Sequence, residues 1–418
     1  MKRAYWVVGY LLAMWFVISF VTNIIGPLMP EIIKDFGLNF GLAGFLPFAF
    51  FVAYGVASIP AGMLVERVGA KRTMALALAV NLCGALPFAA FPSYLMAVCG
   101  LFVIGVGMAM LQVVINPMMR TAGGEEHFAF FSVLGQLVFG LASFVSPLTY
   151  TALMTRAAKA PGDILFSLAP KALPWVSFYW LFAALFLAAL VLTLAMRIPE
   201  VELKEDERAG GWEVHKELLS QPMVWLFFLG IAAYVATEQS LANWMSQFLA
   251  TYHQVSPLGE GAAVVGRFWG LMAVGCAVGL VLLKLLDSRK VLCGATLLAM
   301  ATLLLALFGG REASVIAFAM MGFFLSVMFS IVFSLALNSV PRHHGAFSGI
   351  LCSGILGGAL GPLAVGALGD QVGLRSAMLL ILGTLSYLFF IGAWARPLIA
   401  NATLGKAEQR PVPAEKMA

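Results

Sequence analysis

Charged residues are scarce in this chain. Asp, Glu, Lys and Arg make up 11% of its 418 residues, against roughly a quarter in soluble domains. Hydrophobic residues make up 61%, and the mean hydropathy is +0.95. A chain with so few charges cannot cover a large water-facing surface, so the composition excludes an ordinary soluble protein.

Groups that carry enzymatic or metal chemistry are also few. The five cysteines are odd in number and scattered through apolar stretches, so no disulfide framework is expected. Glu125-Glu126-His127 and His343-His344 lack a third partner at metal-ligand spacing. The apolar stretches contain no paired carboxylates and no nucleophile with a base. We therefore expect no enzymatic activity, no metal and no cofactor.

Long apolar runs dominate instead. Twelve blocks are long enough to cross a hydrocarbon core about 30 Å thick as helices. Strands are excluded, because membrane strands alternate apolar and polar residues and these blocks do not. The sequence therefore predicts an all-α polytopic membrane protein with twelve transmembrane helices. The predicted spans are residues 5–27, 41–65, 73–91, 94–115, 129–152, 174–196, 223–250, 262–286, 290–308, 313–337, 346–368 and 374–395.

The distribution of Lys and Arg predicts the orientation. With both termini inside, 18 of the 25 cations lie on the cytoplasmic side and 7 lie outside, as the positive-inside rule requires. We expect a multi-pass protein of a bacterial-type inner (plasma) membrane with both termini cytoplasmic. The net charge of +5 then faces the anionic headgroups of the lipid bilayer, and no nucleic-acid partner is expected.

A charged segment at residues 197–222 is the largest polar interruption, and it divides the spans six and six. A second polar insert, at about 153–173, enlarges an external loop. The tail has the composition of a disordered segment. The predicted organisation is an N-terminal six-helix bundle (1–196), a cytoplasmic linker (197–222), a C-terminal six-helix bundle (223–396) and a disordered cytoplasmic tail (397–418).

The loop between the second and third spans is the most informative motif. A glycine at a helix end lets a neighbouring helix approach closely, and a carboxylate beside it can cap a helix N-terminus or pair with a cation. Such contacts can form in one conformation and break in another. The loop is therefore predicted to be a conformational switch, although its charges could also simply mark the cytoplasmic side. Its residues are Gly62, Glu66, Arg67, Gly69, Lys71 and Arg72.

The spacing of this loop recurs after the eleventh span. Gly366, Asp370, Gly373 and Arg375 follow each other at the same intervals as Gly62, Glu66, Gly69 and Lys71. If each half contains two three-helix units of opposite topology, the second and eleventh helices are equivalent and end on opposite membrane faces. The alternative is chance, because small and charged residues end many helices.

Twelve spans in two halves, with this loop between the second and third, resemble the major facilitator superfamily, whose usual aspartate is here Glu66. Within it, the chain is similar to the fucose:proton symporter family of sugar transporters along nearly its whole length. The short matches that carry this resemblance are Asn23 with Leu28-Met29-Pro30, Phe51-x-x-Tyr54 with Ile59-Pro60-Ala61-Gly62, Asn116-Pro117, His127-Phe128, Tyr234-Val-Ala-Thr-Glu238 and Phe333-Ser-Leu.

The resemblance implies a central sugar site between the halves and alternating access by rocking of one half on the other. It also implies proton coupling through one acid near the end of the first helix and one in the fourth. The matching positions here are about Gly26 and Gln112. Both acids are absent, so the proton mechanism of that family does not transfer directly.

Glu238 is the strongest candidate for a replacement. It is the one acidic residue that lies deep within a predicted span. A charge at that depth is costly unless it faces water, a partner or a proton, which suits a group that gains and loses a proton in each cycle. The alternatives are a plain sugar ligand, or a permanently neutral or hydrogen-bonded carboxyl that orders the core.

Polar side chains at helical spacing complete the predicted sugar site. Amides offer both donors and acceptors to sugar hydroxyls, residues four apart share one helix face, and an indole can stack on a pyranose ring. The same amides could instead join helices to one another. The predicted substrate-binding residues are Asn23, Tyr54, Gln112, Asn116, Gln136, Glu238, Gln239, Asn243 and Trp244.

One glycine run needs a separate interpretation. Gly354-x-x-Gly357-Gly358-x-x-Gly361 resembles a phosphate-binding run, but no strand precedes it. Close helix packing is the expected role.

These features predict a monomeric secondary active transporter that imports a monosaccharide, a hexose or deoxyhexose, by rocker-switch alternating access. Coupling to a proton or sodium is assigned to Glu238. The alternatives are an uncoupled sugar facilitator, a drug or metabolite exporter of the same superfamily, and a sugar sensor that does not transport.

Overall fold

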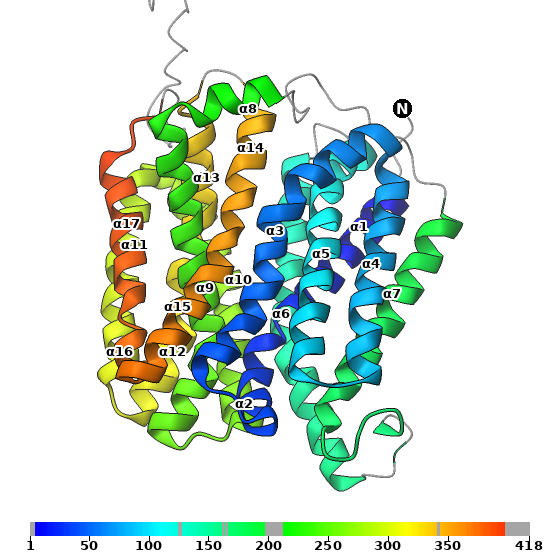
Figure 1. Cartoon of the computed structure of the whole chain (residues 1–418). Coiled ribbons are helices and arrows are strands. Elements are labelled where there is room, and N and C mark those ends of the chain that lie inside the picture. The colour runs from blue at the N-terminus through cyan, green and yellow to red at the C-terminus, as the bar shows by residue number, and fades with distance from the viewer. Residues whose placement is uncertain are drawn as a thin grey trace, which may run out of the picture.

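The structure, a computed structural model, describes residues 5–123, 128–160, 163, 166–196, 212–340 and 343–397. Helices account for all regular structure in these residues (Figure 1). Twelve candidate spans are long and apolar enough to cross a membrane. The predicted fold class and the predicted spans are therefore confirmed, with most ends agreeing within a few residues.

The described helices fall into two groups of six spans. In the N-terminal half the helices are α1 (Tyr5–Thr22), α2 (Ile25–Phe36), α3 (Phe40–Val68), α4 (Ala70–Ala90), α5 (Tyr94–Gly123), α6 (Phe128–Lys159) and α7 (Ser177–Ala195). In the C-terminal half they are α9 (Pro222–His253), α10 (Ala262–Leu285), α11 (Ser288–Phe308), α12 (Arg311–Leu325), α13 (Met328–Leu337), α14 (His344–Ser353), α15 (Gly357–Val372), α16 (Leu374–Ala377) and α17 (Leu380–Trp394).

Several spans are made of two helices rather than one. The first span breaks after Thr22 and continues as α2 to Phe36, beyond its predicted end. The tenth breaks between α12 and α13, and the eleventh between α14 and α15. Transporter binding sites are often built where spans are interrupted. These breaks therefore favour a binding site near the centre of the bundle.

A short amphipathic helix, α8 (Trp212–Leu219), forms within the segment predicted as a plain linker. His215 and Leu218 of α8 are buried, and the Trp225 indole of α9 donates a hydrogen bond to the Leu219 carbonyl. Residues 197–211 and 398–418 of the predicted linker and tail lie outside the described residues. The domain boundaries remain a prediction.

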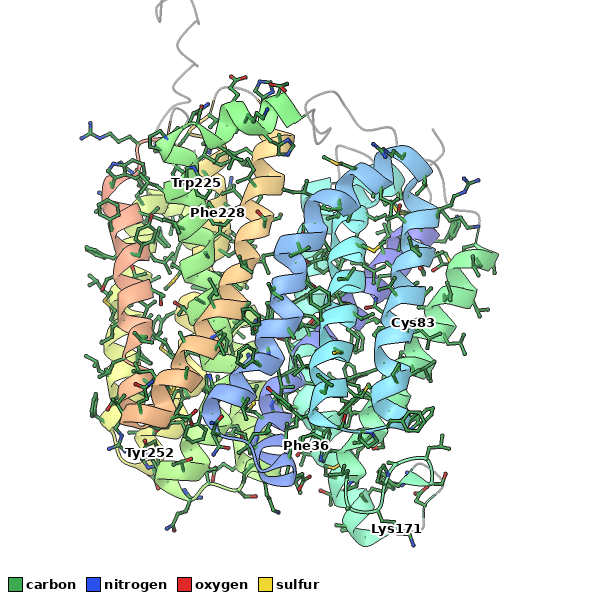
Figure 2. All side chains as sticks on the ribbon, viewed as in Figure 1. Phe36, Cys83, Lys171, Trp225, Phe228 and Tyr252 are labelled. Atoms are coloured by element: carbon green, nitrogen blue, oxygen red, sulfur yellow. The ribbon has the colours of Figure 1, made fainter. Side chains whose placement is uncertain are left out.

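The two membrane faces can be named from these elements. The linker face is the end of the bundle that carries α8 and the turn at Gly69, and the far face is the end that carries the turns at Asn39 and Gly373 (Figure 1). The ninth helix runs the full depth between them. Its Trp225 and Phe228 lie toward the linker face and its Tyr252 at the far face (Figure 2).

The halves meet through backbone contacts at glycines. A Cβ on Gly26 of α2 would overlap the Ala242 carbonyl oxygen of α9, and one on Gly44 of α3 would lie 2.9 Å from Leu363 Cα of α15. Glycine is required where helix backbones approach this closely. Both contacts lie in the part of the bundle near the far face, which is therefore closed.

The helices α5 and α13 contribute little to the contact between the two halves. The helices on which α5 packs are α1, α3, α4 and α6 of its own half, and those on which α13 packs are α9, α11, α12 and α14 of its own half. A hollow of about 350 Å³ lies beside α13. In the described structure the halves are therefore in contact near the far face, and a hollow lies beside the linker-side part of the tenth span.

The glycine run of the eleventh span is a packing surface, as expected. A Cβ on Gly357 would overlap the Ala232 carbonyl oxygen of α9, and one on Gly361 would lie 2.8 Å from Ala236 Cα. Gly354 likewise faces Ile231. These glycines let the eleventh span lie against α9 and leave no room for a phosphate.

We expect Gly357→Ala to destabilise the protein, because the added methyl group must push α15 away from α9. Overpacking of this kind costs about 1–3 kcal/mol. Thermal unfolding of the purified protein measures the effect as a lowered midpoint. Gly294→Ala is the matched control, because Gly294 of α11 has no neighbour within 4 Å of an added Cβ and alanine favours a helix. Equal midpoints for the two variants would contradict the packing role.

Candidate functional site

The Glu238 carboxyl lies in the middle of α9 and is partly exposed. Tyr234, four residues earlier and hence on the same helix face, donates a hydrogen bond from its hydroxyl to Glu238 Oε1 at 3.1 Å. The Gln239 side chain also hydrogen-bonds to this carboxyl. A neutral hydroxyl and an amide thus hold the carboxyl without supplying a positive charge, and its exchange of a cation stays a prediction.

The position of Glu238 along α9 places it next to the contact between the halves. Ala242, which touches Gly26 of α2, lies one helical turn beyond Glu238 on the same face. The sequence of α9 runs from the linker face to the far face. Glu238 therefore lies on the linker side of the closed contact, where a cavity open to the linker face would end.

Two amides extend this polar cluster on α9. The Asn243 amide donates to the Gln239 carbonyl oxygen at 2.8 Å and to Gln239 Oε1 at 3.3 Å. Both side chains are at least 95% buried. The predicted pairing of Gln239 with Asn243 on one face is confirmed, whereas their contact with a sugar stays a prediction.

Asn23 lies at the break between α1 and α2 and is buried. Its amide donates to Ser143 Oγ of α6 at 2.9 Å and to the Ser19 carbonyl oxygen at 3.1 Å. The Ser19 and Ser143 hydroxyls share a further hydrogen bond of 2.6 Å. In this conformation Asn23 therefore joins α1 to α6, the role of interhelical glue that amides commonly have.

The other predicted site residues are placed less directly. Tyr54 of α3 is buried and hydrogen-bonds to Thr22 at the end of α1. Gln112 of α5 is half-buried. The side chains of Asn116 and Gln136 lie outside the described residues. For all four, sugar binding stays a prediction.

Trp244 packs within the closed part of the bundle. It is fully buried, its indole donates to the Pro362 carbonyl oxygen of α15 at 2.9 Å, and its ring meets Phe40 edge to face. These contacts join α9 to α15 and α3 near the far face. A sugar contact by Trp244 requires another conformation, and it stays a prediction.

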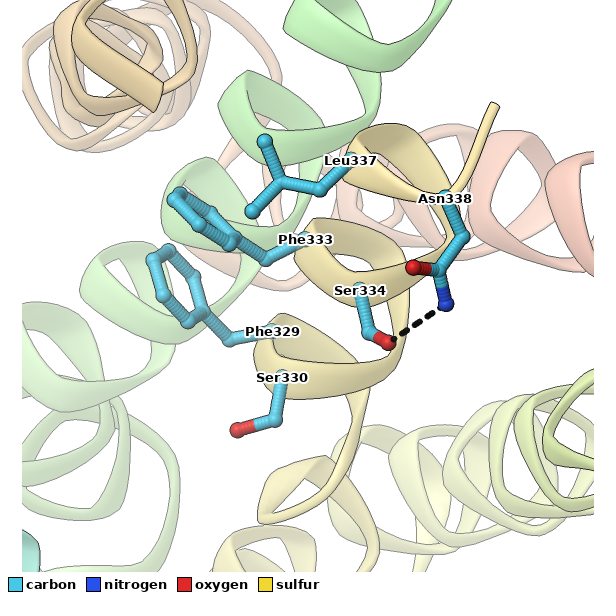
Figure 3. Close-up of a pocket in the computed structure, with 6 residues that line it drawn as sticks. All are labelled: Phe329, Ser330, Phe333, Ser334, Leu337 and Asn338. Carbon is cyan, nitrogen blue, oxygen red and sulfur yellow. Dashed lines mark hydrogen bonds between the residues drawn. The ribbon is translucent and has the colours of Figure 1, made fainter. Parts of the chain in front are cut away.

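The hollow beside α13 is lined by residues that sequence reasoning left out of the site. They form two adjacent stripes along the helix, one apolar and one polar, which extend to different sides of α13 (Figure 3). Serine and asparagine at every fourth position of an apolar span would have been the available signal. We name this surface the α13 groove, and its residues are Phe329, Phe333, Leu337, Ser330, Ser334 and Asn338.

Asp370 closes the far face between the halves. Its carboxylate accepts hydrogen bonds from Phe40 N at 2.8 Å and Gly41 N at 2.7 Å, at the start of α3. A carboxylate at a helix N-terminus satisfies free N–H groups and interacts favourably with the helix dipole. We name this contact, from α15 to α3, the Asp370 clasp.

The two loops of the repeated motif share their turn geometry. Gly69 has φ +86° and ψ +159°, and Gly373 has φ +81° and ψ +149°, values that favour glycine. Lys71 donates to the Leu194 and Met196 carbonyl oxygens at the end of α7. Arg375 stacks over Tyr252 of α9 at 4.5 Å. The equal turns on opposite faces support the inverted repeat.

The remaining loop residues are described in part. Arg67 and Arg72 are exposed and Gly62 is half-buried, while the side chain of Glu66 lies outside the described residues. The switching role of this loop stays a prediction. Among the residues that the structure describes, no three His, Cys, Asp or Glu side chains are grouped as a metal site would need.

Known proteins resemble this chain over most of its length. The glucose/galactose transporter of Brucella abortus is 31% identical over 384 residues, which are 91% of each chain. The L-fucose-proton symporter of Escherichia coli is 22% identical over 379 residues, 87% of this chain and 86% of that protein. A crystal structure of the latter has a TM-score of 0.67 at 20% identity and covers 94% and 99% of the two chains.

A second solved structure has the same fold. It is that of a bacterial homologue of the human lysosomal transporter Spinster, with a TM-score of 0.78 at 15% identity, covering 95% of this chain and 98% of that one. The Major Facilitator Superfamily matches residues 11–352. Because this match covers more than half of the sequence and the fold agrees, the chain belongs to the Major Facilitator Superfamily, and it is a multi-pass membrane transporter rather than an enzyme.

Proposed function

We propose that this protein imports a monosaccharide, a hexose or deoxyhexose, and that Glu238 couples the import to a proton or sodium ion. The names of the relatives support a sugar substrate, since they include a glucose/galactose transporter and a fucose-proton symporter. The cluster of Glu238, Tyr234, Gln239 and Asn243 supplies the donors and acceptors that sugar hydroxyls require.

The observation that carries the coupling role is the environment of Glu238. Its carboxyl contacts a hydroxyl and an amide within an apolar span, and it lies one turn from the contact between the halves. A carboxylate without a cation is costly there. Binding a cation removes that cost. Occupancy of Glu238 therefore favours the rearrangement that changes access to the site from one membrane face to the other.

Gly26 supports this assignment from the other half. The related symporter family implies an acid near this position, and the structure leaves no room for any side chain there while α2 contacts α9. We infer that the coupling group is on α9 instead of α2.

The conformational cycle follows from the clasp and its repeat. The Asp370 clasp holds the far face closed, and its release lets the halves rock about the α3–α15 and α6–α10 contacts. We propose that the loop from Gly62 to Arg72 performs the equivalent task on the linker face, with Glu66 in the place of Asp370.

We further propose that the linker face is cytoplasmic and that both termini lie on that side. The membrane is then a bacterial-type inner (plasma) membrane. The excess of Lys and Arg in the loops of that face supports this orientation. Contact with the lipid bilayer follows from the apolar spans. Since the proposed substrate path lies within one chain, we propose that a monomer is the working unit.

Glu238→Gln tests the coupling. We expect gradient-driven accumulation of sugar to be lost while sugar exchange is kept, because the amide preserves the shape and hydrogen bonding of the site but binds no cation. Proteoliposomes containing the purified protein are tested for counterflow and for uptake after a pH or sodium jump. D-Glucose, D-galactose and L-fucose serve as substrates.

Glu260→Gln is the matched control, because Glu260 pairs with Arg311 at the far face within one half and has no role in the site. If Glu238→Gln still accumulates sugar, the coupling role is wrong. If wild type and variant both merely equilibrate sugar, the protein is a facilitator. Wild-type binding without counterflow would identify a sensor, and transport of amphipathic drugs in place of sugars would identify an exporter.

Asp370→Ala tests the clasp. Loss of both hydrogen bonds removes a helix cap worth about 0.5–2 kcal/mol, so the ratio of far-face-open to far-face-closed molecules rises between about twofold and thirtyfold. Spin labels at Ser93 and Glu312, exposed far-face residues of opposite halves, report this as a longer distance. Glu260→Ala, which removes a far-face carboxylate within one half, leaves the distances unchanged. An unaltered distribution in Asp370→Ala would refute the clasp.

A further inference from the structure

The α13 groove combines an apolar stripe with a polar stripe. Phe329, Phe333 and Leu337 recur at every fourth position, and Ser330, Ser334 and Asn338 follow each of them by one residue. Residues four apart share a helix face, so each set forms one stripe, and the two stripes are offset by one residue, about 100° around the helix (Figure 3). The groove therefore presents carbon rings along one edge and hydroxyl and amide groups along the other.

The polar stripe indicates that this face meets water rather than lipid. Ser330 and Ser334 are both exposed, and the Asn338 amide reaches Ser334 Oγ at 3.5 Å. Without another partner, a serine hydroxyl in a helix can donate only to a backbone carbonyl of the preceding turn. An asparagine amide in hydrocarbon is costly without partners. Three such residues in line fit a water-filled path on the linker side of the bundle.

Aromatic rings connect the groove to Glu238. The rings of Phe329 and Phe333 are stacked, with centroids 5.7 Å apart and planes inclined by 26°. Phe329 also meets Tyr234 at 5.6 Å, and the Tyr234 hydroxyl is the donor to Glu238. A continuous series of side chains thus leads from the carboxyl in the middle of α9 to the linker end of α13.

We propose that the α13 groove is a second binding subsite for a monosaccharide, occupied between its release from the Glu238 cluster and its exit at the linker face. This inference rests on the proposed sugar transport. A sugar ring has an apolar C–H face and a rim of hydroxyls, which match the two stripes. The hollow of about 350 Å³ lies at the small end of ligand pockets, about 300–1,000 Å³, and suits one sugar ring.

The test is the half-saturating sugar concentration measured separately at each face, with D-glucose and D-galactose, in right-side-out and inside-out membrane vesicles. We expect Phe333→Ala to raise this value at the linker face about five- to tenfold, the effect of losing one ring contact, and to leave the far-face value within about twofold. Phe333→Tyr keeps the ring and retains the wild-type value, whereas Phe333→Leu behaves like Phe333→Ala.

Two further variants make the test independent of folding. Ser334→Ala and Ser330→Ala remove only exposed hydroxyls, and each is expected to raise the linker-face value about threefold, as the loss of one hydrogen bond would. Phe308→Ala is the matched control, because Phe308 of α11 is 60% exposed and lies outside the groove. It leaves both values unchanged.

The outcomes separate this inference from the function on which it rests. If the wild-type protein transports neither sugar, the proposed function fails. If the wild type transports sugar and the groove variants leave the linker-face value unchanged, the second subsite is wrong. If Phe333→Ala and Ser334→Ala shift both faces equally, the groove acts on the Glu238 cluster and is not a separate subsite. A shift confined to the linker face supports the proposal.

Discussion

Close backbone contact between helices of opposite halves is the constraint on which this structure depends. Membrane helices gain little from hiding apolar side chains from one another, since the lipid is equally apolar, and they associate through packing and hydrogen bonds instead. At Gly26 and Gly44 the two halves touch with no side chain between them. These contacts seal one face, determine which helices line the interior, and place Glu238 immediately beside the seal.

The sequence predicted the twelve spans and their division into halves well, because apolar length alone determines them. It also directed the search for a coupling group to Glu238, since a lone acid within an apolar span has few structural uses, and the coupling role of Glu238 stays a prediction. Features that depend on which side of a helix faces the interior were harder to predict. Trp244 gives no such signal, because an indole can pack in a core or stack on a sugar ring. The α13 groove is marked in the sequence only by Ser330, Ser334 and Asn338 at every fourth position, and this short polar stripe alone does not distinguish a cavity face from a packed face.

Helix breaks and terminal contacts also went beyond sequence reasoning. Gly26-Pro27 follow the interruption after Thr22, and Pro27 has no N–H to donate to the Asn23 carbonyl, yet no break was predicted there. No proline marks the interruption after Leu325, and α8 lies in a segment whose charge suggests an unstructured linker. By contrast, the repeated spacing around Gly69 and Gly373 was readable, because a left-handed turn leaves glycine as the favoured residue. The spacing did not show, however, that Asp370 reaches across to the first turn of α3.

The location of Glu238 determines which half of the protein carries the coupling ion during a transport cycle. A coupling acid on α2 would travel with the N-terminal half, whereas one on α9 belongs to the C-terminal half, as does the α13 groove beside it. In the mechanism proposed here the driving ion and the departing solute share a single rigid body. The N-terminal half then only opens and closes access to the site. Mutations that weaken its packing should alter the transport rate more than the ratio of ions to sugar molecules.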